Sequence, residues 1–250
     1  MNETIQQLQN HKSIRKYKAQ PIEESIIDAI LQATQQAPSW INGQQMSIIR
    51  ITDSEKRTKM MELAGNQAYV GTAPEFWVFC LDFQRAAKAC EIEVKPFSIA
   101  DNVDALLVGA TDAGIALGTA VAAAESFGLG TVPIGGVRKD AQAVAELLEL
   151  PTYVYPISGL CIGYPDEQPA VKPRLPKQAV LFENTYNADL HEALHQYNEQ
   201  FAEYMMERTN GKSNANWSSG IAAFYSEPFY RDNSYADPMP ALQKQGFLKK

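Results

Sequence analysis

The stretch VDALLVGATDAGIALGTAVAAAESFGLG, residues 103–130, decides how the rest of the chain is interpreted. It is the longest apolar run in the sequence, and its many alanines and glycines let other elements approach closely. Asp104, Asp112 and Glu125 interrupt it, and a membrane span of about 20 apolar residues would not tolerate three acidic side chains. We therefore expect a buried helix from about residue 102 to residue 127, and no membrane span.

Strands surround this helix in the sequence. EFWVFCL (75–81) and YPISGLCIGY (155–164) are nearly continuous apolar runs, typical of strands that are covered on both faces. MSIIRI (46–51) and GTVPI (130–134) predict two more strands, and helical patterns occupy residues 21–37, 53–64, 139–150 and about 189–207. Strands separated by helices indicate an α/β or α+β layered domain. No linker rich in Pro, Gly or Ser divides the chain, so we expect one domain with an extended C-terminal arm.

Composition limits the possible classes of function. The 250 residues carry a formal net charge of -7, and this acidic balance argues against a broad nucleic-acid surface, which needs many cations. The opening MNETIQQLQN is polar and lacks the apolar segment of a signal peptide, so we expect a cytoplasmic protein. Cys80, Cys90 and Cys161 show no metal-binding spacing and are expected to be reduced packing residues.

The segment HKSIRKYK, residues 11–18, concentrates positive charge in this acidic chain. If it is extended, His11, Ser13 and Arg15 share a face, because side chains alternate along extended backbone. An imidazole, a hydroxyl and a guanidinium suit a phosphate group and a carbonyl oxygen. The alternative is a solvated basic turn that stabilises the C-terminal end of the preceding helix.

The segment KPRLP, residues 172–176, holds a second pair of cations. Its prolines exclude helix, so Lys172 and Arg174, two residues apart, should point the same way. Two cations held on one face by stiff backbone favour an anionic ligand. The alternative is a proline-rich surface loop whose charges are simply solvated.

The segment PIGGVR, residues 133–138, follows a predicted strand. The pair Gly135 and Gly136 would let backbone N–H groups approach a flat ligand closely, although an ordinary tight turn explains it equally well. His191 and His195 have the spacing of metal ligands on a helix, but no H-E-x-x-H accompanies them and a solvated helix face is the better interpretation. Nucleophile and Walker patterns are missing from the sequence, which points to chemistry supplied by a bound cofactor, with no metal site.

Nine motifs together resemble a known family: HKSIR, PSWINGQQ, SIIRITD, GNQAYV, EFWVFC, AAESFGLGTVPIGGVR, GLCIGYP, KPRLP and ENTY, in this order. They resemble the FMN-dependent nitroreductase family, in its larger subgroup of oxygen-insensitive NADPH nitroreductases and NADPH–flavin oxidoreductases. The resemblance runs from about residue 4 to residue 217.

This resemblance implies an α+β three-layer sandwich, in which helices flank a central, mainly antiparallel sheet. It implies an FMN-binding domain over residues 1–217, an arm of the same domain over 218–250, and an interlocked homodimer with FMN at each of two sites in the subunit interface. The implied FMN-binding residues are His11, Lys12, Ser13, Arg15, Ser39, Gln67, Ile134, Gly135, Gly136, Lys172 and Arg174.

The resemblance also assigns roles to these residues. The phosphate end of FMN would be bound mainly by His11, Ser13, Lys172 and Arg174. Arg15 would lie near the pyrimidine edge of the flavin ring, Gln67 and Ser39 would contact the ring or the ribityl chain, and Ser39 would come from the partner subunit. Ile134, Gly135 and Gly136 would cover one face of the ring and offer backbone N–H groups near N5.

For the reductant, ERTNGKSN resembles a loop whose arginine holds the 2′-phosphate of NADPH. Arg208 takes the place of that arginine, and Lys212 would be the second cation. NADH is the alternative reductant, and a flexible loop with scattered charge is the alternative interpretation of this segment. Beyond Trp217 the resemblance fades, and it assigns no role to Arg231.

Three departures from the subgroup concern the site. Lys12 stands where arginine is usual, which keeps the charge but removes a bidentate donor. Pro133 replaces an aromatic residue beside the flavin. Trp40 and Ile41 replace part of a serine-rich loop and would reshape the acceptor pocket.

The resemblance implies a ping-pong oxidoreductase that transfers two electrons from NADPH through FMN to nitroaromatics, quinones or free flavin. One alternative is a flavin, azo-dye or metal-oxidant reductase whose nitro reduction is incidental. Another is a flavin-binding carrier or sensor without turnover. Small-molecule electron acceptors and a second copy of the chain are the expected partners.

Overall fold

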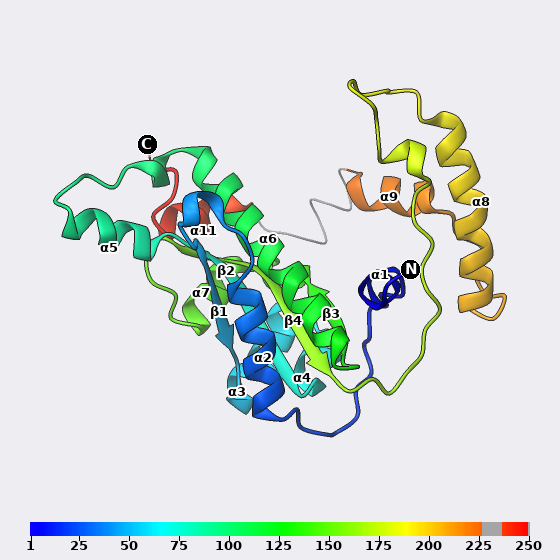
Figure 1. The fold of residues 1–250 in the computed structure, drawn as a ribbon, viewed down its shortest axis with the longest axis horizontal. Coiled ribbons are helices and arrows are strands. Elements are labelled where there is room, and N and C mark those ends of the chain that lie inside the picture. The colour runs from blue at the N-terminus through cyan, green and yellow to red at the C-terminus, as the bar shows by residue number, and fades with distance from the viewer. Residues whose placement is uncertain (227–236, 250) are drawn as a thin grey trace. The chain divides into compact units, whose positions relative to one another are not determined.

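A four-stranded antiparallel sheet forms the centre of the computed structural model, which describes residues 1–226 and 237–249. Its strand order is β1-β2-β4-β3 (Figure 1). The strands are β1 (Met46–Arg50), β2 (Glu75–Asp82), β3 (Gly130–Ile134) and β4 (Val154–Gly163). Each matches a predicted strand, and each neighbouring pair is antiparallel, so the fold is α+β rather than α/β.

Strand β2 is covered on both faces of the sheet, which explains why its sequence does not alternate between polar and apolar residues. All of its residues are buried, and its side chains alternate between two hydrophobic clusters on opposite faces of the sheet. Phe76 and Val78 belong to one cluster, whereas Trp77 and Phe79 belong to the other. Both faces of the strand are therefore covered, as the apolar run EFWVFCL predicts.

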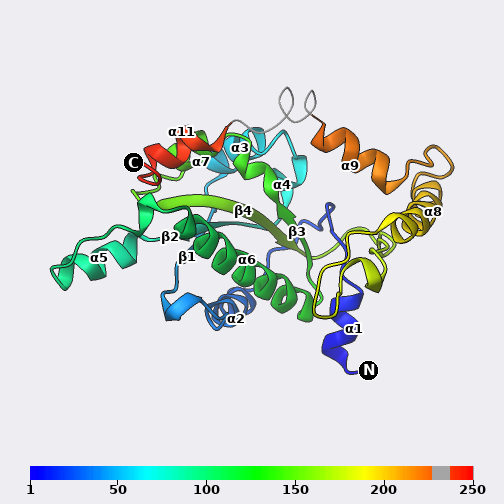
Figure 2. The ribbon, with the colours of Figure 1, turned by 90° about the horizontal axis from the view of Figure 1, so that it is seen from above.

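Helices cover the sheet on both faces, which confirms the predicted three-layer sandwich (Figure 2). One layer contains α2 (Glu24–Gln35) and α6 (Val103–Ser126). The layer on the other face contains α3 (Ser54–Leu63), α4 (Ala68–Thr72), α7 (Ala141–Leu147) and α11 (Pro238–Lys244). Side-chain caps begin several of these helices: Asp53 accepts from the Lys56 amide at 2.7 Å, and Asn102 accepts from the Asp104 amide at 2.9 Å.

Helix α6 is buried on one face only. Its small residues, among them Gly109, Ala113, Ala116 and Ala120, lie against the sheet, so the predicted buried helix is confirmed for that face. The other face exposes large apolar side chains, Val103, Leu107 and Ile115. In the described ranges, α6 is long and apolar enough to span a membrane by length and composition alone. Core helices of soluble proteins commonly meet the same criterion.

Several elements were not predicted. They are α4, α5 (Gln84–Ile92), α9 (Trp217–Tyr225), α11 and the short turns η1 (Trp40–Asn42), η2 (Ile99–Asp101) and η4 (Lys177–Ala179). The turn considered for Gly135 and Gly136 is η3 (Gly135–Arg138). The helix that precedes HKSIRKYK is α1 (Glu3–Gln9), and the helix expected near residues 189–207 is α8 (His191–Arg208).

The chain forms two compact units. The first consists of residues 1–168 with the described C-terminal residues 237–249, and it contains the whole sheet. The second contains η4, α8 and α9, where Asn198 and Ser218 exchange two hydrogen bonds of 2.9 Å. The expected limits at residues 1–217 and 218–250 stay a prediction, and Arg231 lies outside the described residues.

Candidate functional site

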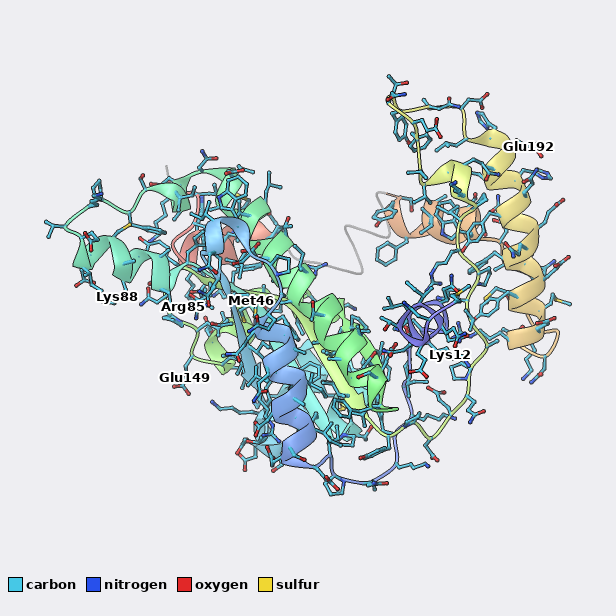
Figure 3. The ribbon with its side chains drawn as sticks, viewed as in Figure 1. Lys12, Met46, Arg85, Lys88, Glu149 and Glu192 are labelled. Carbon is cyan, nitrogen blue, oxygen red and sulfur yellow. The ribbon has the colours of Figure 1, made fainter. Side chains whose placement is uncertain are left out.

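The basic segment after α1 is extended and runs beside β3. Ser13 forms a parallel bridge with Thr131, and the amide of Ile14 donates to the Thr131 carbonyl at 2.9 Å. Gly130 permits this approach, because a Cβ there would collide with the side chain of Ile14. Lys12, labelled in Figure 3, is half-buried just beyond the end of α1. The predicted extended conformation is therefore present.

His11 is held by a residue that the sequence did not reveal as part of a site. Nδ1 of His11 lies 2.7 Å from Oε1 of Glu125, and Thr131 Oγ1 donates to the same oxygen at 2.8 Å. The Glu125 side chain is only 11% exposed at the end of α6. This contact fixes the imidazole through one nitrogen and leaves Nε2 as the nitrogen that can face a ligand.

Gln67, Gly136 and Tyr69 form a second cluster in the first unit. The hydroxyl of Tyr69 donates to Oε1 of Gln67, whose Nε2 donates to the Ala64 carbonyl at 2.6 Å. A Cβ on Gly136 would clash with both Ala64 and Gln67, so glycine is required there. The predicted residues Gln67 and Gly136 therefore lie together, fixed by Tyr69, which the sequence did not single out.

Arg15 joins this cluster. Its guanidinium carbon lies 6.0 Å from the centre of the Tyr69 ring, at the outer limit of a cation–π contact. The backbone that carries Arg15 is fixed by Glu167, whose Oε1 accepts from the amides of Arg15 and Lys16 at 2.5 and 3.1 Å. No carboxylate in residues 1–226 and 237–249 pairs with the Arg15 guanidinium, so its charge is available to an anion or a carbonyl oxygen.

A buried cation positions the helix that carries this cluster. Arg57 of α3 donates to the carbonyls of Val70 at 3.0 Å and Ile51 at 3.1 Å, and also to that of Ala73. Burial lowers the pKa of this guanidinium from its usual value. Because Val70 lies in α4 and Ala73 caps its C-terminal end, Arg57 fixes the helix that begins directly after Gln67.

Ser39 lies elsewhere. It follows α2, on the opposite face of the sheet from Gln67 and Gly136, and its Oγ accepts from the Gln44 amide at 3.1 Å. Within one chain Ser39 is therefore not brought to the cluster around Arg15. Of the PIGG residues, Ile134 has its side chain buried in the core, which leaves backbone as the part that a ligand can reach.

In the second unit, Lys172 and Arg174 line one pocket, as their two-residue spacing predicts. The pocket has a volume of about 1120 Å³, and its other lining residues include Tyr197, Phe201 and Trp217. Nη1 of Arg174 donates to the Lys172 carbonyl at 3.0 Å, and the Tyr197 hydroxyl donates to the Pro173 carbonyl at 2.8 Å. The convergence of this segment with His11 and Arg15 stays a prediction.

Arg208 and Lys212 lie at the C-terminal end of α8 and in the loop after it. Nη1 of Arg208 is 3.4 Å from the Tyr204 hydroxyl, and Lys212 is exposed. Thr209 shapes the loop, since its Oγ1 accepts from the Ser213 amide at 2.9 Å. Two cations thus stand four residues apart, within reach of solvent.

Comparison with known proteins identifies the family of this chain. Residues 8–164 match the nitroreductase family, and residues 172–250 match the C-terminal domain of that family. The chain belongs to the nitroreductase family. The chain is 50% identical to an FMN reductase [NAD(P)H] of Bacillus subtilis over 99% of this chain and 98% of that one. It is 40% identical to an oxygen-insensitive NADPH nitroreductase of Salmonella typhimurium over 88% and 90%.

Solved structures of the nitroreductase family share the fold. The structure of B. megaterium NfrA2 superposes with a TM-score of 0.94 at 48% identity, covering 99% of this chain and 98% of that one. The predicted α+β nitroreductase fold is thereby confirmed.

The donors of this nitroreductase-family chain fit a phosphorylated flavin. An imidazole, a hydroxyl and a guanidinium alternate along one extended segment, and the amide of Gln67 lies in the cluster beside Arg15. The described residues contain no group of three potential ligands placed for a metal ion. All three cysteines are free, and burial raises the pKa of Cys161 to about 12, so that thiol is not a nucleophile at neutral pH.

Proposed function

We propose that this chain is an FMN-dependent NAD(P)H oxidoreductase that reduces nitroaromatics, quinones or free flavin by two electrons in a ping-pong cycle. The names of the two relatives, an FMN reductase and an NADPH nitroreductase, support the reaction class. The observation that supports the proposal most is the extended segment beside β3, which carries His11, Ser13 and Arg15 at alternate positions, with Glu125 in contact with the imidazole.

The residues of the chain would act by binding and orientation. His11 and Ser13, with Lys12, Lys172 and Arg174, would hold the phosphate through charge-assisted hydrogen bonds. Arg15 would face the pyrimidine edge, and Gln67 with the backbone of Ile134, Gly135 and Gly136 would hold the ring. When bound, FMN supplies hydride chemistry, so no side chain has to serve as a nucleophile.

The proposal includes a homodimer in the cytoplasm. A groove of about 320 Å³ runs between α6 and η1, and exposed apolar residues line it, including Trp40, Leu107 and Ile115. A second copy of the chain would cover these side chains, since a contiguous apolar patch on the surface favours association. In such a dimer, Ser39 of the partner subunit would reach the flavin that Gln67 holds.

NADPH is the proposed reductant. Arg208 and Lys212 would bind its 2′-phosphate, which NADH lacks. The exposure of Lys212 and the absence of a carboxylate paired with Arg208 in the described parts of the chain support this role.

A visible spectrum tests the proposal directly. Protein purified and dialysed against buffer should be yellow, with the spectrum of bound flavin, and anaerobic NADPH should bleach it. NADH serves as the matched control and should bleach it more slowly at equal concentration. A colourless protein that takes up no added FMN would contradict the proposed function.

The physiological acceptor is a separate question. The FMN reductase among the relatives favours free flavin as the alternative acceptor, with nitro reduction incidental. Steady-state kcat/KM values for FMN, a nitroaromatic, a quinone and an azo dye would rank these acceptors. Flavin binding without NADPH oxidation by any acceptor would instead indicate a carrier or sensor.

A further inference from the structure

The loop of residues Ser39–Gln44 holds a strained backbone at the surface. Ile41, Asn42 and Gln44 have φ angles of 49°, 55° and 52°, in the left-handed region that a β-branched residue such as Ile41 rarely adopts. Trp40 is 61% exposed and Ile41 is 80% exposed, so burial of these side chains does not stabilise the loop within one chain. Other groups must hold it in this conformation.

Arg85 of α5 holds one end of the 39–44 loop. Nη2 donates to the carbonyls of Gln44 and Met46, each at 2.6 Å, and Nη1 donates to Ser47 Oγ and Asp82 Oδ2, each at 2.9 Å. Figure 3 shows Arg85 and Met46 close together. One guanidinium thus joins the end of the loop, the start of β1 and the end of β2.

Asp112, in the middle of α6, holds the other end. Its side chain is only 5% exposed, and Oδ1 accepts from the Trp40 amide at 3.1 Å. Oδ2 is buried without a hydrogen-bond partner in the part of the chain that the structure describes. A buried carboxylate with one unpaired oxygen destabilises a fold, and the neighbouring core residues of α6 are small and apolar. Asp112 therefore stands where an apolar residue would be more stable.

We infer that Asp112 and Arg85 are positioning residues, which hold the 39–44 loop in the conformation that presents Ser39, Trp40 and Ile41, across the proposed dimer interface, to the flavin held by the second copy of the chain and to its electron acceptor. The inference rests on the proposed FMN-dependent function. A cavity of about 370 Å³ adjoins the loop and is lined by Ser39, Gln44, Arg85 and Asp112. A loop released from its two anchors has room to collapse into this cavity, so the anchors are needed to keep it in its left-handed turn conformation.

Hydrogen exchange tests the anchoring without using enzyme activity. We expect the peptide containing residues 38–46 to exchange about tenfold faster in Asp112→Leu, because the Trp40 amide loses its acceptor. Asp112→Asn should stay within about twofold of the wild type, since its amide oxygen can still accept. Asp104→Leu is the matched control: Asp104 is exposed on the same helix. The melting temperature of Asp112→Leu should equal or exceed that of the wild type, whereas loss of a merely structural residue would lower it.

Kinetics test the positioning role. For Asp112→Leu we expect the FMN dissociation constant and the KM of the acceptor to rise about tenfold, the effect of one lost hydrogen bond. The rate of flavin reduction by NADPH, at saturating FMN, should stay within about twofold. Arg85→Gln should show the same pattern; its side chain is 53% exposed, so this variant tests the inference even if Asp112→Leu fails to fold.

The outcomes separate the inference from the proposed function. A wild-type protein that binds no FMN overturns both. A wild type that binds FMN and turns over, with Asp112→Leu or Arg85→Gln indistinguishable from Asp104→Leu in exchange, FMN affinity and acceptor KM, overturns the inference alone. Equal losses in the acceptor and NADPH half-reactions would also overturn it, because they would indicate general damage.

Discussion

The carboxylate of Glu125 accepts a hydrogen bond from Thr131 and lies 2.7 Å from Nδ1 of His11, so one side chain orients a group that the proposal assigns to the phosphate. Glu125→Ala would free the imidazole to rotate. We expect this variant to raise the FMN dissociation constant about tenfold, as for loss of one charged hydrogen bond, and Glu125→Gln to raise it less. Fluorescence titration measures the affinity. Glu91→Ala, a change on the exposed face of α5, is the control; equal affinity of Glu125→Ala and this control would contradict the assigned role.

The buried thiols make a prediction about pH. Burial raises the pKa of Cys161 to about 12, whereas a thiol in the unfolded chain titrates near ~8.5. Above that pH the unfolded state loses a proton that the folded state keeps. Stability should therefore fall as pH rises, by about 1.4 kcal/mol per unit for this group. Urea unfolding between pH 7 and pH 10 should show a shallower decline for Cys161→Ala, and an unchanged decline for the half-exposed control Cys90→Ala.

At the level of single residues, the sequence predicts which side chains share a face of an extended segment, but not which residues far along the chain contact them. Alternation along extended backbone predicts that His11, Ser13 and Arg15 share one side. The sequence does not reveal the roles of Glu125 and Tyr69, because their contacts depend on the fold. Glu125 is 114 residues from His11 and contacts it because the end of α6 leads directly into β3, which runs beside the basic segment.

Helix α11 shows which interaction holds a terminal element. Its Lys244 pairs with Glu146 of α7 at 2.5 Å and lowers the pKa of that carboxyl, but both side chains are more than half exposed. Phe247, directly after the helix, is 0% exposed and packs edge-on against Phe83 and Tyr153. We expect Phe247→Ala to lower the free energy of unfolding by about 3–5 kcal/mol, and Lys244→Ala by less than about 1 kcal/mol. Urea denaturation of both variants measures the two changes in unfolding free energy. Equal losses in Phe247→Ala and Lys244→Ala would show that the ion pair contributes as much as the buried ring.

Elements with a strong local signal were predicted, and those defined by tertiary contacts were not. Helix α6 has an Asn cap and a Gly stop, and β2 is apolar from Phe76 to Leu81, so both are evident in the sequence. Helix α5 begins at Gln84, its N-cap position Phe83 provides no side-chain cap, and none of the helix residues is buried. Helix α11 is seven residues long and depends on the burial of Ala241, Leu242 and Phe247, which no local pattern can show.

For the whole molecule, the sequence predicted the layers because strands alternate with helices along the chain. It could not place the two basic segments relative to each other, since they belong to different compact units, residues 1–168 and 169–226. Binding of one flavin phosphate by both basic segments, residues 11–18 and 172–176, therefore depends on how the units and two copies of the chain assemble. Residue types alone do not determine that geometry.

The exposed face of α6 provides the test of this assembly. Leu107 is 62% exposed and Ile115 is 38% exposed, and both line the groove that contains Trp40. Carboxylates at these positions would have to be desolvated against a second copy of the chain, at a cost of several kcal/mol. We expect sedimentation velocity to show a dimer for the wild type and a monomer for the double variant Leu107→Glu, Ile115→Glu, which should also lose FMN on dialysis. Ile92→Glu, at a 77% exposed apolar position on α5, is the control and should remain a yellow dimer. A wild-type monomer that retains FMN would show that Ser39 of a partner subunit is not needed to hold the flavin.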